Sequence, residues 1–140
     1  MTSDPSRPES APGCVAMTDA AKSAELKAFV DTANARARER RRGLEARRQR
    51  GLALARRAAE RLKTEYGASQ VAVFGSVLKP HLFHERSDID LAVWGLDEQL
   101  YLRALSALLD LEPDISVDLV EVEQARPELQ GVIERDGLWL

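Results

Sequence analysis

The hydrophobic pattern changes its period at Gly67, and this change constrains the fold more than any other feature. Before Gly67, apolar residues recur every three or four positions, as in a helix that packs on a core. After it come three apolar runs with strand-like patterns, at residues 71–74, 89–93 and 115–122. A helical pattern over residues 97–111 separates the last two runs. The alternation predicts an α/β domain in which helices cover a small sheet.

A last helix is expected from about Gln124 to Arg135. Pro127 suits its first turn and Gly137 suits the position beyond its end, before a short apolar tail. With a short helix or loop expected directly after Gly75, the predicted order of elements is α-β-α-β-α-β-α.

The chain before this domain divides into two parts. Residues 1–18 are rich in Pro, Ser and Ala without periodicity, and we expect a disordered tail there. Residues 19–51 form an Arg-rich helical extension, in which Gly43 and Gly51 leave open one helix or two. The α/β domain is then expected to occupy residues 52–140.

Charge is distributed unevenly along the chain. Residues 1–66 carry 15 Lys and Arg against 9 Asp and Glu, whereas residues 67–140 carry 5 against 14. The basic run 36–50 fits either a solvated helix face or an arm that contacts a partner. Because no aromatic residue is interleaved to stack on bases, the run does not favour RNA recognition. An acidic half that binds an anionic nucleotide needs divalent cations between them.

Composition excludes several classes of protein. No window approaches the apolar length of a membrane span, and the first residues lack the pattern of a signal peptide. The single Cys14 cannot form an internal disulfide, and the two histidines, His81 and His84, do not have zinc-ligand spacing. We therefore expect a cytoplasmic protein whose metal, if any, is held by oxygen.

The most informative motif is Asp88-Ile89-Asp90 at the start of the second apolar run. Side chains alternate along a strand, so Asp88 and Asp90 project from one face while Ile89 enters the core. Two adjacent carboxylates resist joint ionisation, and a hard divalent cation relieves their repulsion. The motif predicts a Mg²⁺ site.

Asp118 lies within the third apolar run, where a carboxylate without a partner is costly. If its strand adjoins that of Asp88 and Asp90, the three carboxylates can hold two Mg²⁺ ions about 3.5–4 Å apart, the spacing that serves in-line displacement at phosphorus. Asp118 is also the candidate general base for the acceptor hydroxyl.

Gly75 and Ser76 follow the first apolar run. At such a turn, backbone N–H groups and the serine hydroxyl can bind the triphosphate tail of a nucleotide, and glycine lets phosphate approach the backbone. The GxxxxGK[ST] spacing of a P-loop is absent, so nucleotidyl transfer is favoured over kinase or GTPase activity.

These motifs resemble a known family. Phe-Gly-Ser, a variable stretch, Ser-Asp-Ile-Asp-Leu and later Val-Asp-Leu-Val are similar to the signature of polymerase-beta-type nucleotidyltransferases. The short chain and its closing residues 132–138 resemble the minimal nucleotidyltransferases that act as antitoxins beside HEPN-domain ribonuclease toxins. The chain departs from the family pattern at residues 77–81, where relatives often carry a small residue, an arginine and a glycine.

The resemblance implies a polymerase-beta-type nucleotidyltransferase fold, with a small mixed sheet flanked by helices. It implies that Gly75 and Ser76 bind phosphates, that Asp88 and Asp90 ligate both metals, and that Asp118 completes the metal site or acts as base. It further implies transfer of AMP from ATP to a tyrosine of the toxin, with which the chain would form a hetero-oligomer. Two alternatives stay open: a small-molecule nucleotidyltransferase of the aminoglycoside-modifying type, and an antitoxin that acts by binding alone.

Overall fold

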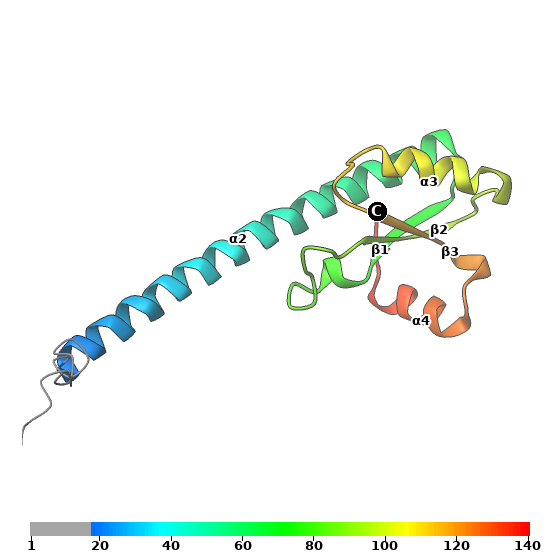
Figure 1. Ribbon diagram of the computed structural model, residues 1–140. Coiled ribbons are helices and arrows are strands. Elements are labelled where there is room, and N and C mark those ends of the chain that lie inside the picture. The colour runs from blue at the N-terminus through cyan, green and yellow to red at the C-terminus, as the bar shows by residue number, and fades with distance from the viewer. Residues whose placement is uncertain (1–17) are drawn as a thin grey trace, which may run out of the picture. The chain divides into compact units, whose positions relative to one another are not determined.

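The computed structural model describes residues 18–140 and has the mixed α/β fold that the sequence predicts (Figure 1). By its internal contacts the chain divides into two compact units, residues 1–41 and residues 42–140. The second unit contains the sheet and both hydrophobic clusters. It begins ten residues before the predicted domain start at residue 52, so residues 42–51 of the predicted extension belong to it. The tail predicted for residues 1–18 lies outside the described residues, except for Thr18.

The first helix, α2 (Asp19–Glu65), is a single helix that runs through both Gly43 and Gly51. The Thr18 hydroxyl accepts a hydrogen bond from a backbone N–H of the first turn at 3.1 Å, which is an N-cap contact. Gly67 follows the helix with a φ of +72°, in the left-handed region where glycine is favoured. The predicted helix stop at this glycine is confirmed.

Four strands form one mixed sheet. They are β1 (Gln70–Phe74), β2 (Ile89–Trp94), β3 (Val117–Glu121) and β4 (Leu138–Trp139). Their order is β3-β2-β1-β4, with β1 antiparallel to β2 and β4, and β3 parallel to β2. The first three strands lie where the sequence predicts them. The sequence does not predict β4, because a strand of two residues is too short to show alternation.

Short helices connect the strands. They are η1 (Ser76–Leu78), η2 (Glu98–Leu100), α3 (Tyr101–Leu109), η3 (Val122–Gln124) and α4 (Pro127–Asp136), the η elements being 3₁₀ turns. The predicted element between β1 and β2 is thus a single turn, which lets these strands pair antiparallel. α4 begins at Pro127, later than the predicted start at Gln124, because proline lacks an N–H and suits the first helical position. Within residues 18–140, no helix combines the length and apolarity needed to cross a membrane.

The two faces of the sheet are covered differently (Figure 1). α2 and α3 cover the first face, where the larger hydrophobic cluster lies. Its members include Leu54, Leu62, Val71, Val73, Ile89, Leu91, Val93, Leu108 and Leu119. α4 covers the second face over a smaller cluster. This cluster consists of Ala72, Phe74, Ala92, Val122 and Ile133.

Gly51 has a packing role that the sequence does not reveal. It is buried in α2, and a Cβ at this position would lie 2.5 Å from Cδ1 of Ile89 and 3.6 Å from Cγ2 of Val77. The missing side chain therefore allows α2 to approach β2 and η1 closely. The sequence indicates only the cost of a glycine within a helix.

Part of the basic run 36–50 binds the domain itself. Arg47 donates a hydrogen bond to the backbone carbonyl of Asp114 at 2.8 Å. Arg50 forms ion pairs with Glu112 and Asp114. Arg47 is thus half-buried against the domain, whereas Arg50 stays exposed, as on a solvated helix face. A partner-binding role of the run stays a prediction.

Candidate active site

The predicted phosphate-binding turn lies directly after β1. Gly75 precedes η1 with a φ of +82°, a conformation that favours glycine. A Cβ on Gly75 would clash with Oδ2 of Asp90 and lie 3.1 Å from its Cγ. Glycine is thus needed here for both backbone conformation and space. The turn carries the half-buried Ser76 and packs against one of the predicted metal ligands.

Asp90 and Asp118 lie side by side in the sheet. They are register partners on the parallel strands β2 and β3. Because side chains alternate along a strand, both carboxylates share the face of Ala92 and Val120, which α4 partly covers. Asp88 comes directly before β2, and its negative charge acts on Asp90. The fold therefore brings Asp90 and Asp118 together at one end of the second face, with Asp88 directly before the same strand.

The carboxylates repel one another at this end of the sheet. Burial, together with the negative charges of Asp118 and Asp88, raises the pKa of Asp90 to about 6. No lysine, arginine or histidine is among the groups that shift the pKa of Asp90. Asp90 is half-buried, whereas Asp88 and Asp118 are exposed. The site therefore holds negative charge that no described cation offsets.

Ser87 anchors the loop directly before Asp88, a role that the sequence does not predict. Its side chain is buried, and its Oγ accepts a hydrogen bond from the N–H of His84 at 2.9 Å. Its own N–H donates to the carbonyl of His84 at 3.0 Å. On the other side of Asp88, the N–H of Ile89 donates to the carbonyl of Ser116 at 2.9 Å. The backbone of Asp88 is thus held from both sides, and the only signal in the sequence is a serine preceding Asp-x-Asp.

Tyr101 is a second neighbour of the site that the sequence does not reveal. Its hydroxyl donates to the carbonyl of Leu119 at 2.7 Å, one residue beyond Asp118. Burial raises the pKa of Tyr101, and the charges of Asp118 and Glu121 add to the effect. The tyrosine fixes the start of α3 to β3, and it stays protonated at neutral pH, so it keeps this hydrogen bond.

The chemistry of these residues fits a hard divalent cation. Carboxylate oxygens are the ligands that Mg²⁺ prefers, and the repulsion at Asp90 is what such an ion relieves. In their present positions, no three His, Cys, Asp or Glu side chains within residues 18–140 converge into one metal-binding group. Asp88 and Asp118 are exposed, and a metal site made of these three carboxylates stays a prediction.

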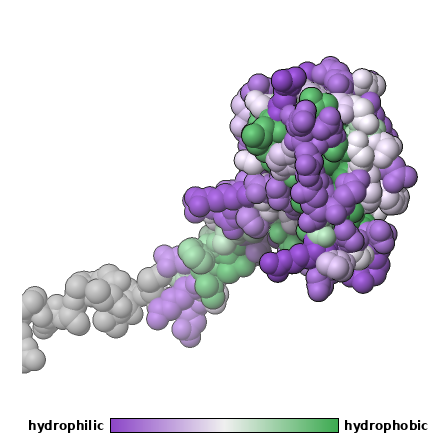
Figure 2. Space-filling model, turned by 90° about the vertical axis from the view of Figure 1, so that its right-hand side faces the viewer, coloured by the Kyte–Doolittle hydropathy of each residue, from purple (hydrophilic) through white to green (hydrophobic). Residues whose placement is uncertain are grey.

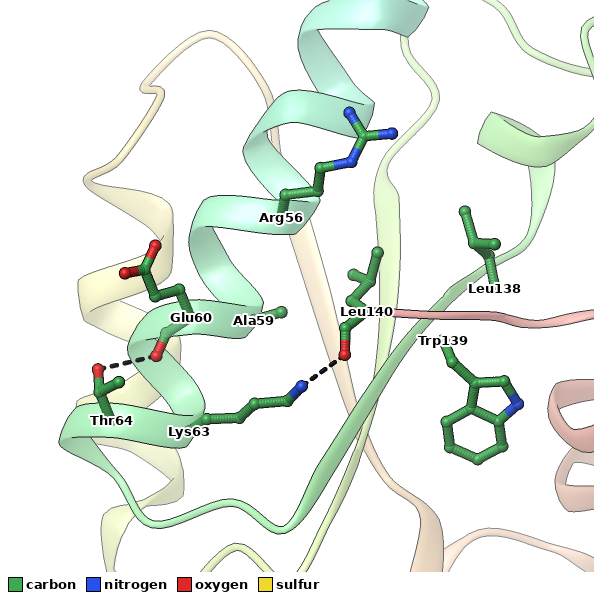
Figure 3. A pocket seen from close by; sticks show the side chains of 8 residues that line it. All are labelled: Arg56, Ala59, Glu60, Lys63, Thr64, Leu138, Trp139 and Leu140. Atoms are coloured by element: carbon green, nitrogen blue, oxygen red, sulfur yellow. Dashed lines mark hydrogen bonds between the residues drawn. The ribbon is translucent and has the colours of Figure 1, made fainter.

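A pocket among the described residues lies away from the aspartates. This pocket, of about 510 Å³, is formed by α2 and the end of the chain from β4 onward (Figure 3). It is lined by Arg56, Ala59, Glu60, Lys63, Thr64, Leu138, Trp139 and Leu140. None of the five predicted site residues lines it. The face drawn in Figure 2 is mostly hydrophilic, with small separate hydrophobic patches.

Comparisons with known proteins cover the part of the chain that carries these motifs. The family model described as polymerase beta, nucleotidyltransferase matches residues 57–140. A structure described as a minimal nucleotidyltransferase is 32% identical, with 71% of this chain and 95% of that chain covered and a TM-score of 0.46. A toxin–antitoxin structure with AMP-PNP is 25% identical, with 59% and 69% covered and a TM-score of 0.50. A mutant MntA toxin–antitoxin structure is 22% identical, with 61% and 70% covered and a TM-score of 0.51.

A comparison with curated proteins gave no match. The family match covers more than half of the chain, and it includes β1, the Gly75-Ser76 turn and the strands that carry the aspartates. The predicted family, fold and enzyme class are confirmed. The chain belongs to the polymerase beta family of nucleotidyltransferases.

Proposed function

We propose that the chain is a Mg²⁺-dependent nucleotidyltransferase that transfers AMP from ATP to a HEPN-domain toxin and thereby acts as its antitoxin. The observation that carries the proposal is the pairing of Asp90 with Asp118 on adjacent strands, with Gly75 packed against Asp90. One acidic centre and one phosphate-binding turn thus lie in contact, which is the arrangement that nucleotidyl transfer needs.

The five predicted residues have distinct roles. Asp88, Asp90 and Asp118 hold two Mg²⁺ ions, and Gly75 and Ser76 bind the triphosphate. When bound, the metal ions neutralise phosphate charge and orient the α-phosphate for attack. The left-handed backbone at Gly75 brings main-chain N–H groups close to a phosphate, and the hydroxyl of Ser76 adds a donor.

The proposed reaction is an in-line displacement at the α-phosphorus of ATP. Asp118, the exposed member of the pair, accepts the proton of the acceptor hydroxyl. The hydroxyl oxygen then forms a bond to the α-phosphorus, and the bond from that phosphorus to the bridging oxygen of the β-phosphate breaks. AMP remains on the acceptor and pyrophosphate leaves with the bond electrons.

One comparison supports a protein acceptor. A toxin–antitoxin structure with AMP-PNP is 25% identical to this chain. We therefore propose a toxin that presents a tyrosine hydroxyl, in a cytoplasmic complex of the two proteins.

Transfer of label from ATP tests the proposal. The protein is mixed with Mg²⁺, ATP labelled at the α-phosphate, and the product of the adjacent reading frame. We expect covalent label on that product, and no label when EDTA replaces Mg²⁺. Asp90→Asn should lower the rate about 1000-fold or more, equal to about 4 kcal/mol of barrier.

Asp110→Asn is the matched control, because Asp110 is an exposed aspartate at the end of α3 and outside the site. It should label the partner at the normal rate. If the partner is neutralised without any label, and equally well by Asp90→Asn, the protein acts by binding and the proposed transfer is wrong.

A further inference from the structure

Arg48 of α2 is bound to the turn that follows Gly75. Its Nη1 donates to the carbonyl of Val77 in η1 at 2.9 Å. Its Nε and Nη2 donate to the two carboxylate oxygens of Glu45, both at 2.8 Å. The side chain of Arg48 is only 15% exposed. A guanidinium group with two nitrogens bound to a carboxylate and a third bound to the turn has little freedom to move.

The three carbonyls from Gly75 to Val77 each accept a hydrogen bond. The carbonyl of Gly75 accepts from Leu78 at 3.2 Å, and that of Ser76 accepts from Lys79 at 2.9 Å. Arg48 binds the next carbonyl along, that of Val77. The first N–H groups of a helical turn have no partner within the turn, so those at the start of η1 stay available while these carbonyls are held.

The same turn of α2 also packs against the strand that carries the aspartates. Gly51 lies three residues after Arg48, and its missing side chain makes room for Ile89, which stands between Asp88 and Asp90. Val77 is also within reach of a Cβ built at Gly51, at 3.6 Å. One stretch of helix thus contacts both parts of the site, the turn and the strand.

We infer that residues 45–51 of α2 are a positioning element for the site, in which Arg48 holds the phosphate-binding turn in register with the aspartate-bearing strand. The inference rests on the proposed function, because it assigns the turn to the triphosphate. These residues precede the family match, which begins at residue 57, so the element lies outside the part shared with the family model. Glu45 keeps Arg48 in place over a wide pH range, since hydrogen bonds from Arg48 and Gln49 lower the pKa of Glu45 to about 2.

Arg47 provides a matched control for Arg48. It is the neighbouring arginine, it is also half-buried, and it also donates to a backbone carbonyl at 2.8 Å. Its acceptor, however, is Asp114, in the loop before β3 rather than in η1. Arg47→Ala therefore removes an equivalent hydrogen bond without touching the turn.

The experiment measures binding of ATP with Mg²⁺ to the full-length protein, and hydrogen exchange of its backbone, well below the unfolding temperature. Arg48→Ala should weaken ATP binding about 10-fold or more, which is the usual effect of losing a residue that holds a binding group in position. Arg47→Ala should stay within about twofold. Exchange of the N–H groups of Leu78 and Lys79 should rise about 10-fold in Arg48→Ala while the strands keep their protection.

Further variants separate the possible outcomes. Arg48→Lys keeps the positive charge but not the planar guanidinium group, and it should recover part of the ATP binding that Arg48→Ala loses. If Arg48→Ala does not fold, Glu45→Gln takes its place and should weaken binding in the same direction. Equal binding by the Arg47 and Arg48 variants, or a rise in exchange across all strands, overturns the positioning role.

Failure of the proposed function looks different. The site assignment is wrong if the unaltered protein does not bind ATP with Mg²⁺, or if Asp90→Asn causes no loss of binding. The positioning role is then lost with it. If only Asp90→Asn loses binding, the proposed function stands and the inference about Arg48 falls.

Discussion

The two faces of the sheet serve different purposes, although they are built from alternate residues of the same strands. On the face covered by α2 and α3, the inward side chains of β1 and β2 are all valine, leucine or isoleucine, and each is at most 1% exposed. On the α4 face the apolar cover is smaller and ends where Asp90 and Asp118 begin. Neighbouring residues such as Leu91 and Asp90 therefore contribute to opposite properties. The first face stabilises the fold, and the second gives up stability to hold charge.

The largest effect on stability should come from the first face. Leu62 is fully buried in α2, and Leu62→Ala should lower the free energy of unfolding by about 2–5 kcal/mol, because a cavity remains beside the lost contacts. Urea unfolding measures the loss. Leu102→Ala, at a side chain 76% exposed on α3, should change it by less than about 0.5 kcal/mol. If Leu62→Ala also weakened ATP binding per folded molecule, the separation of the two faces would be incorrect.

The second-largest effect on stability should come from Gly75→Ala, which adds a methyl group at the edge of the second face. Gly75→Ala forces a left-handed residue to carry a Cβ that clashes with Asp90, so we expect a loss of about 1–3 kcal/mol. ATP binding should weaken about 10-fold or more, because the turn and the carboxylate are displaced together.

Gly131→Ala is the control for this change, since nothing lies within 4 Å of a Cβ at this position in α4. It should stabilise the protein by up to about 1 kcal/mol through helix propensity. Normal ATP binding by Gly75→Ala would contradict the assigned contact between turn and site.

Much of this division could be predicted from the sequence. The alternation in Asp88-Ile89-Asp90 indicates which side chains are buried, and Ile89 is fully buried as expected. The third apolar run places Asp118 in a strand, and the structure adds that β3 is the direct neighbour of β2. Local patterns carry this information because alternation is a property of each strand alone.

What could not be predicted depends on contacts between distant segments. The close approach at Gly51 requires Ile89, which lies 38 positions later in the chain, and helix propensity alone indicates only a cost. β4 forms because β1 offers a free edge, not because two residues prefer a strand. The arginine contacts of α2 likewise depend on loops whose positions are set by the whole fold.

The pH dependence of stability should come from the second face, through Asp90, and its effect should be smaller than those of the two substitutions above. The pKa of Asp90 is about 6 in the folded protein against 3.8 as the ordinary value, so the folded state retains a proton that the unfolded chain releases. This contribution to stability is complete below about pH 4 and is lost as pH rises through 6. The full shift corresponds to about 3 kcal/mol, and solvent screening at this half-buried group reduces it to about 1–2 kcal/mol.

Asp90→Asn should therefore be more stable than the unaltered protein above pH 6 and equal to it near pH 4, in urea unfolding without divalent cations. Mg²⁺ should narrow the difference at pH 7 by stabilising only the unaltered protein. Asp110→Asn, with its exposed side chain, should show neither effect. A difference of the same size at both pH values would mean that the Asp90 charge is not the cause.

The smallest effect should come from the charged contacts that belong to neither face. Arg50 is 47% exposed, and its partners Glu112 and Asp114 lie in the loop before β3. Ion pairs between exposed side chains contribute little, because water screens them and ordering long side chains costs entropy. We expect Arg50→Ala to lower the Tm by less than about 2 °C, and 0.5 M NaCl to remove the difference. A larger decrease in the Tm that salt does not remove would mean that Arg50 holds the loop before Asp118 in place. This ion-pair cluster would then belong with the second face.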